Sequence, residues 1–102
     1  MPATKARPLP EVVEELMRSR GIEDLEELHA RFVETEYACI PVPGRHRGKP
    51  VSLDEFKRHA RGEYPILYGE FAQGVAKVLE LTNEEMGELA YSYMWGRPRF
   101  MQ

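Results

Sequence analysis

The segment Val51-Ser-Leu-Asp-Glu-Phe-Lys-Arg-His-Ala-Arg-Gly62 decides the fold, because it has the features of a short, capped helix. Ser52 and Glu55 form an S-x-x-E capping box, in which each residue satisfies a free backbone donor of the other. Its apolar residues recur at helical spacing and predict one buried stripe. The residues of this stripe are Leu53, Phe56 and Ala60. A glycine follows where a left-handed C-terminal cap belongs, so we expect a helix over residues 52–61 with an apolar and a basic side.

Four further helices are predicted from apolar residues at helical spacing. Two precede the capped segment, over residues 9–21 and 23–32. Two follow it, one opened by Pro65 and one by a capping box of Thr82 and Glu85. The residues expected to point inward near the end of the last helix are Tyr93 and Met94.

Two features interrupt this helical pattern. Gly69 and Gly74 weaken the prediction of the fourth helix, since a glycine costs about 1 kcal/mol relative to alanine in a helix. Residues 36–50 lack helical periodicity, and their β-forming residues are broken by prolines, which predicts a short edge strand or an irregular insert. The expected fold class is therefore all-α, with five short helices and this insert between the second and the third.

The composition suits one small soluble domain. A chain of 102 residues, of which 42% are hydrophobic and 30% charged, buries a single core. We expect an N-terminal arm at residues 1–8, a helical domain at 9–95 and a C-terminal tail at 96–102. No apolar run is long enough to span a bilayer, and the single cysteine, Cys39, cannot form an internal disulfide. We therefore expect a cytoplasmic protein that does not associate with membranes.

The charges are distributed unevenly along the chain. The net charge is −3, which argues against a nonspecific nucleic-acid binder. The segment from Arg45 to Arg61, however, contains six cations and only two carboxylates. Its net charge is therefore +4, which leaves a net charge of about −7 for the rest of the chain. The six cations are Arg45, Arg47, Lys49, Lys57, Arg58 and Arg61. This segregation favours a protein with one basic face, although surface charges also cluster by chance.

Two stretches carry a resemblance to a known family. Phe56-Lys-Arg-His-Ala-Arg-Gly-Glu-Tyr-Pro65 looks like the exit of a recognition helix, and Val75-Ala-Lys-Val-Leu-Glu-Leu-Thr-Asn-Glu-Glu85 looks like a fourth helix running into a fifth. With five short helices in this order, the chain resembles the lambda repressor/Cro-type (XRE-like) helix-turn-helix family over most of its length. The resemblance implies a helix-turn-helix-type bundle that binds double-stranded DNA, with the third helix in the major groove.

The chain departs from this family between its second and third helices. Fifteen residues, 36–50, stand where the family has a turn of a few residues, and His29 lies near a position that is usually small. The insert either splays the two helices or forms a basic flap, in which Arg45, Arg47 and Lys49 add phosphate contacts.

The resemblance implies a role for each polar residue of the third helix. Ser52 and Asp54 lie where a recognition helix reaches base edges, and a carboxylate there accepts from cytosine N4 or merely stabilises the helix dipole. The cations Lys57, Arg58 and Arg61 bind guanine or phosphate, or else form a solvated helix face. The expected DNA-binding residues are Ser52, Asp54, Lys57, Arg58, Arg61, Arg45, Arg47 and Lys49.

No constellation of residues suggests an enzyme. The three histidines are isolated, and the spacing of Cys39 and His46 matches no zinc pattern, so we expect neither a metal nor a cofactor and expect Cys39 to be buried. The aromatic residues Tyr91, Trp95 and Phe100 exceed what one short helix can bury, which predicts a homodimer through the C-terminal end.

The sequence thus predicts a sequence-specific DNA-binding transcriptional regulator that is not an enzyme. The alternative is a protein-interaction module on a DNA-binding-like helical fold that does not bind DNA. The net acidity, the long insert and the aromatic C-terminal end favour this alternative.

Overall fold

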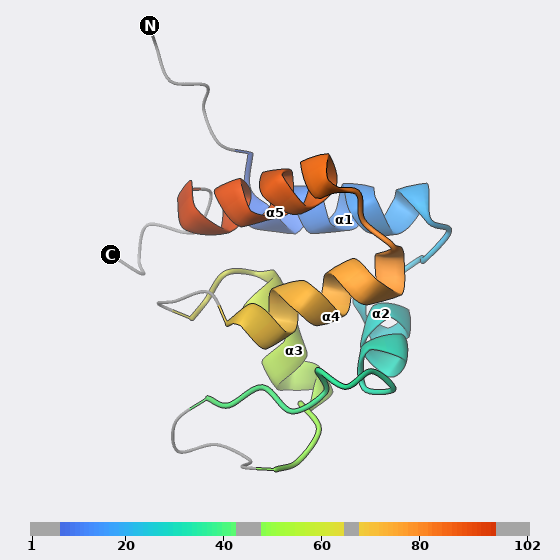
Figure 1. Ribbon diagram of the computed structural model, residues 1–102, viewed down its shortest axis with the longest axis vertical. Helices are drawn as coiled ribbons and strands as arrows, with labels where there is room; N and C mark the ends of the chain where they lie inside the picture. The colour runs from blue at the N-terminus through green and yellow to red at the C-terminus, as the bar shows by residue number, and fades with distance from the viewer. Residues whose placement is uncertain (1–6, 43–47, 65–67, 96–102) are drawn as a thin grey trace, which may run out of the picture.

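The computed structural model describes residues 7–42, 48–64 and 68–95 and contains five helices (Figure 1). These are α1 (Leu9–Ser19), α2 (Leu25–Phe32), α3 (Leu53–Ala60), α4 (Gly69–Leu79) and α5 (Asn83–Trp95). No strand occurs in these ranges, so the described ends of the insert are irregular. The all-α prediction with five helices is confirmed.

Helices α1 and α5 lie side by side and run in opposite directions (Figure 1). At one end, the Ser92 hydroxyl donates a hydrogen bond of 2.6 Å to the carbonyl of Arg7. The Arg7 guanidinium also pairs with Glu15 at 2.9 Å and Glu88 at 3.3 Å. The residue that precedes α1 by two positions is therefore held against both helices.

At the other end of this pair, Glu85 connects the start of α5 to the end of α1. Thr82 and Glu85 form the predicted reciprocal capping box, with N–O distances of 2.9 and 3.1 Å. The Arg20 Nη1 atom donates to Glu85 Oε2 at 2.7 Å. The hydrogen bonds that Arg20 and the Thr82 amide donate to the ionised carboxylate lower the pKa of Glu85 to about 2.

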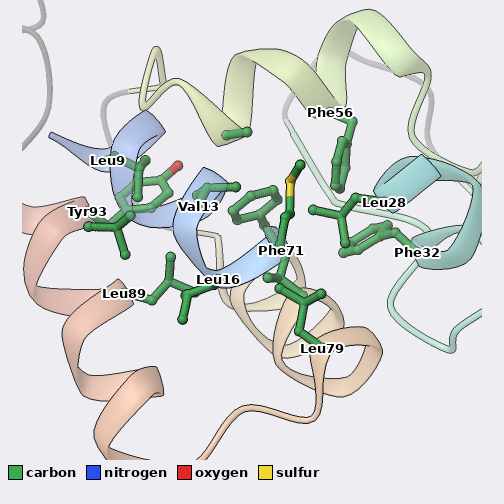
Figure 2. Packing of buried hydrophobic residues seen from close by; sticks show 14 of the residues in the cluster. Leu9, Val13, Leu16, Leu28, Phe32, Phe56, Phe71, Leu79, Leu89 and Tyr93 are labelled. Atoms are coloured by element: carbon green, nitrogen blue, oxygen red, sulfur yellow. The ribbon is translucent and has the colours of Figure 1, made fainter. Parts of the chain in front are cut away.

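Three phenylalanine rings join α2, α3 and α4 in the core (Figure 2). The ring centroid of Phe32 lies 5.0 Å from that of Phe56 and 6.2 Å from that of Phe71, and all three side chains are fully buried. Gly74 of α4 faces this cluster, because a Cβ atom built at Gly74 would lie 2.2 Å from Cε2 of Phe32. The glycine thus permits a close approach of α4 to α2.

The insert does not splay α2 and α3. The Val51 amide donates to the carbonyl of Ala38 at 2.8 Å, which closes the base of the insert, and Ile40 and Val51 are buried. His29 does not separate the helices either, because its Nε2 donates to the Val51 carbonyl at 2.7 Å. The two helices therefore remain in contact.

Three expectations about single elements were wrong. Helix α4 begins at Gly69 and not near Pro65, since Tyr68 occupies the N-cap with extended backbone angles, while residues 65–67 lie outside the described ranges. Met94 is 57% exposed, because the core side of α5 is formed by Leu89, Ser92 and Tyr93. Cys39 is also exposed.

Candidate nucleic-acid interface

Helix α3 is fixed at both ends by the caps that its sequence predicts. The Ser52 hydroxyl accepts a hydrogen bond of 3.2 Å from the Glu55 amide. At the other end, Gly62 adopts a φ of 73°, and the Glu63 amide donates to the Arg58 carbonyl at 3.0 Å. This left-handed backbone geometry favours glycine, so the helix stops there.

Four charged residues of α3 and its C-cap share the solvent side, which we call the α3 face: Asp54, Lys57, Arg58 and Arg61. The remaining charged residue of α3, Glu55, is buried. Asp54, Arg58 and Arg61 are exposed and lie at positions i, i+4 and i+7, so they follow one another along the helix. Lys57 lies at the edge of this face and is half-buried. On the opposite side, Phe56 and Ala60 are anchored in the core.

The cations of the α3 face are only weakly paired. Lys57 Nζ lies 3.6 Å from Glu26 of α2, and Arg61 lies 3.9 Å from Glu63. Within the described ranges, Arg58 forms no ion pair. Because exposed ion pairs contribute between about 0 and 1 kcal/mol, a phosphate or a base edge can displace these carboxylates.

The remaining predicted residues fall into three groups. The Ser52 hydroxyl is engaged in capping the helix, and this role explains the residue without a DNA contact. Lys49 is exposed three positions before Ser52, at the end of the insert. Arg45 and Arg47 lie outside the described residues.

A groove of about 320 Å³ borders the α3 face and lies between α1, the start of α2 and the end of α3. Its apolar floor is formed by Val13, Met17, Leu25 and Ala60. Its acidic rim is formed by Glu14, Glu23, Asp24 and Glu26. Sequence reasoning did not pair Glu26 with Lys57, because the two lie thirty-one positions apart and no local pattern links them.

His59 lies on the core side of α3 in a box of aromatic rings. Its ring centroid is 4.3 Å from Tyr64, 5.4 Å from Tyr68 and 5.5 Å from Phe71. The side chain is fully buried, and neither ring nitrogen has a hydrogen-bond partner within the described residues. Burial disfavours the charged imidazolium and lowers the pKa of His59 to about 4.

No family model, curated protein or solved structure matches the chain. Among the residues that the structure describes, no three His, Cys, Asp or Glu side chains come together as metal ligands. In the same ranges, no helix combines the length and the apolar character needed to cross a bilayer.

Proposed function

We propose that this protein is a cytoplasmic, sequence-specific DNA-binding transcriptional regulator that acts as a homodimer, with α3 as its recognition helix. The observation that carries the proposal is the α3 face, on which Arg58 and Arg61 project into solvent from a helix that is capped at both ends. The resemblance to the lambda repressor/Cro-type family supports the same helix. No catalytic role is proposed.

Two further features support a duplex as the partner. An arginine fork bonds guanine O6 and N7, or a phosphate, through two parallel hydrogen bonds, and Arg58 is unpaired within the described ranges. The His29–Val51 hydrogen bond keeps α2 beside the start of α3, so α2 can cross the DNA backbone while α3 enters the groove. Lys49 lies at the same end of α3, where it can reach a phosphate.

Replacing both Arg58 and Arg61 with alanine is expected to weaken duplex binding at least about tenfold and to reduce the salt slope by roughly two, since each phosphate contact contributes about one unit. The duplex is first selected from a random pool, and affinity is then measured by fluorescence anisotropy at several salt concentrations. Lys77→Ala is the matched control, because it removes an exposed cation that is paired with Glu36 on another face. Unchanged affinity and slope in the double variant would show that the assigned face is wrong.

Replacing Glu26 with glutamine is expected to strengthen duplex binding by about two- to fivefold, because a phosphate no longer competes with this carboxylate for Lys57. Glu34→Gln removes an exposed carboxylate that forms no ion pair within the described ranges and serves as the control. Anisotropy titrations with the selected duplex measure both variants at low salt. A Glu26→Gln protein that binds as weakly as the control would exclude a contact from Lys57 to DNA.

The groove beside α3 favours a second candidate, a protein-interaction module without DNA binding. Its apolar floor and its acidic rim suit a partner side chain more than a phosphate, since four carboxylates line the groove beside Lys57 and Arg61. A duplex selection that enriches no sequence, together with a captured protein whose binding depends on Glu23 and Glu26, would decide for this candidate.

A further inference from the structure

Helix α5 is apolar on two opposite sides. Its core side packs against α1 and contains Leu89 and Tyr93, which are both 1% exposed. On the other side lies a solvent-facing strip that we call the α5 stripe: Gly87, Tyr91, Met94 and Trp95. Tyr91, Met94 and Trp95 are 44%, 57% and 66% exposed. A helix that is apolar on both sides is usually buried on both sides, so the exposed side chains of Met94 and Trp95 call for a partner.

The shape of the α5 stripe makes it complementary to itself. A Cβ atom built at Gly87 would meet no atom within 4 Å, so the stripe is open and flat at this position. Trp95, its largest projection, lies eight residues further on, about 12 Å along the helix axis. When two copies of α5 cross in opposite directions, each tryptophan comes to lie over the other copy's glycine. A parallel pair would instead oppose the two tryptophans.

The charges along α5 favour the same direction. Glu84 and Glu88 flank the early part of the stripe, and the last turn of α5 contains no basic residue. In a parallel pair, the carboxylates of the two copies would face each other and repel. In an antiparallel pair they lie opposite the last turn of the partner's α5, which contains no carboxylate.

We propose that two copies of this chain associate through the α5 stripe as an antiparallel pair, with Trp95 of each copy packed over the partner's Gly87. This inference rests on the homodimer of the proposed function but does not require DNA binding. Helix α3 lies on the other side of the molecule from α5 and packs against α1 and α2 (Figure 1). The dimer therefore leaves both α3 faces uncovered.

The single tryptophan of the chain makes the interface directly measurable. Sedimentation equilibrium is expected to show a monomer–dimer equilibrium, and the emission of Trp95 is expected to shift to the blue as the dimer forms. Trp95→Ala is expected to weaken the dimer at least about tenfold, as for a typical aromatic anchor. A monomer at high micromolar concentration, or a dimer that forms without a change in Trp95 emission, would overturn the proposed interface.

The Gly87→Gln variant tests whether the α5 stripe forms the dimer interface or only supports the fold of the monomer. In the monomer, glutamine occupies open space and is a better helix former than glycine, so the melting temperature at high dilution is expected to rise. In the dimer, the same side chain fills the place of Trp95, so association is expected to weaken at least about tenfold. Gly69→Gln, at another open helical glycine away from the stripe, is expected to leave association unchanged. A Gly87→Gln dimer as tight as the wild-type dimer would overturn the proposal. Loss of duplex binding with the dimer intact would count against the DNA-binding function alone.

Discussion

Replacing Gly74 with alanine is expected to lower the free energy of unfolding by about 2–3 kcal/mol, which is a large share of the stability of a small domain. The added methyl group would lie 2.2 Å from Cε2, 2.7 Å from Cδ2 and 2.9 Å from Cζ of the Phe32 ring. That ring is fully buried between Phe56 and Phe71 and cannot rotate away. Helix α4 must therefore move off α2, despite the gain of about 1 kcal/mol in helix propensity. Urea denaturation followed by circular dichroism measures the loss.

Two further variants test whether the clash with Phe32 is the cause. Gly69→Ala adds a methyl group at another glycine of α4, where nothing lies within 4 Å, and is expected to leave stability unchanged or slightly higher. In a Phe32→Leu background, the smaller side chain leaves room, so Gly74→Ala is expected to cost less than in the wild type. Equal costs in the two backgrounds would mean that the methyl group disturbs something other than the ring.

Local patterns in the sequence predicted most of the fold. The predicted capping residues Ser52 and Thr82 each accept the amide hydrogen bond expected of them, at 3.2 and 3.1 Å. The apolar spacing of Phe56 and Ala60 correctly separated the buried side of α3 from its charged side. These predictions succeeded because a helix end and a helix face depend on residues within four positions of one another.

What the sequence could not predict depends on residues that are distant along the chain. In the sequence, Gly74 only weakened the prediction of helix α4. The reason for a glycine at this position is the closeness of the Phe32 ring, which only the folded structure reveals. Lys57 was expected to project freely, but Glu26 of another helix lies beside it. Met94 matched the helical spacing of the inward residues, yet the side of α5 that faces α1 was decided by tertiary packing. Pairings of this kind have no local pattern.

Lowering the pH from 7 to 5 is expected to reduce the free energy of unfolding by about 2 kcal/mol through His59 alone. The pKa of His59 falls from 6.5 in the unfolded chain to about 4 in the folded protein, because burial of the ring disfavours its charged form. Between pH 6.5 and about 4, His59 therefore binds a proton in the unfolded chain but not in the folded protein. Stability decreases as the pH falls towards 4 and changes little with this group at lower pH.

His59→Leu isolates this contribution from that of the acidic residues. Leucine keeps an apolar side chain between Tyr64 and Phe71. It also removes two buried nitrogens that have no hydrogen-bond partner in the part of the chain that the structure describes, so stability at pH 7 is expected to be equal or higher. Glu85, whose pKa is lowered to about 2, loses its stabilising charge only well below pH 5. Urea denaturation of both proteins from pH 7 to 5 should therefore show a decline that is steeper in the wild type. Parallel curves would place His59 in a hydrated environment and contradict the packing of α3 against α4, on which the orientation of Arg58 and Arg61 depends.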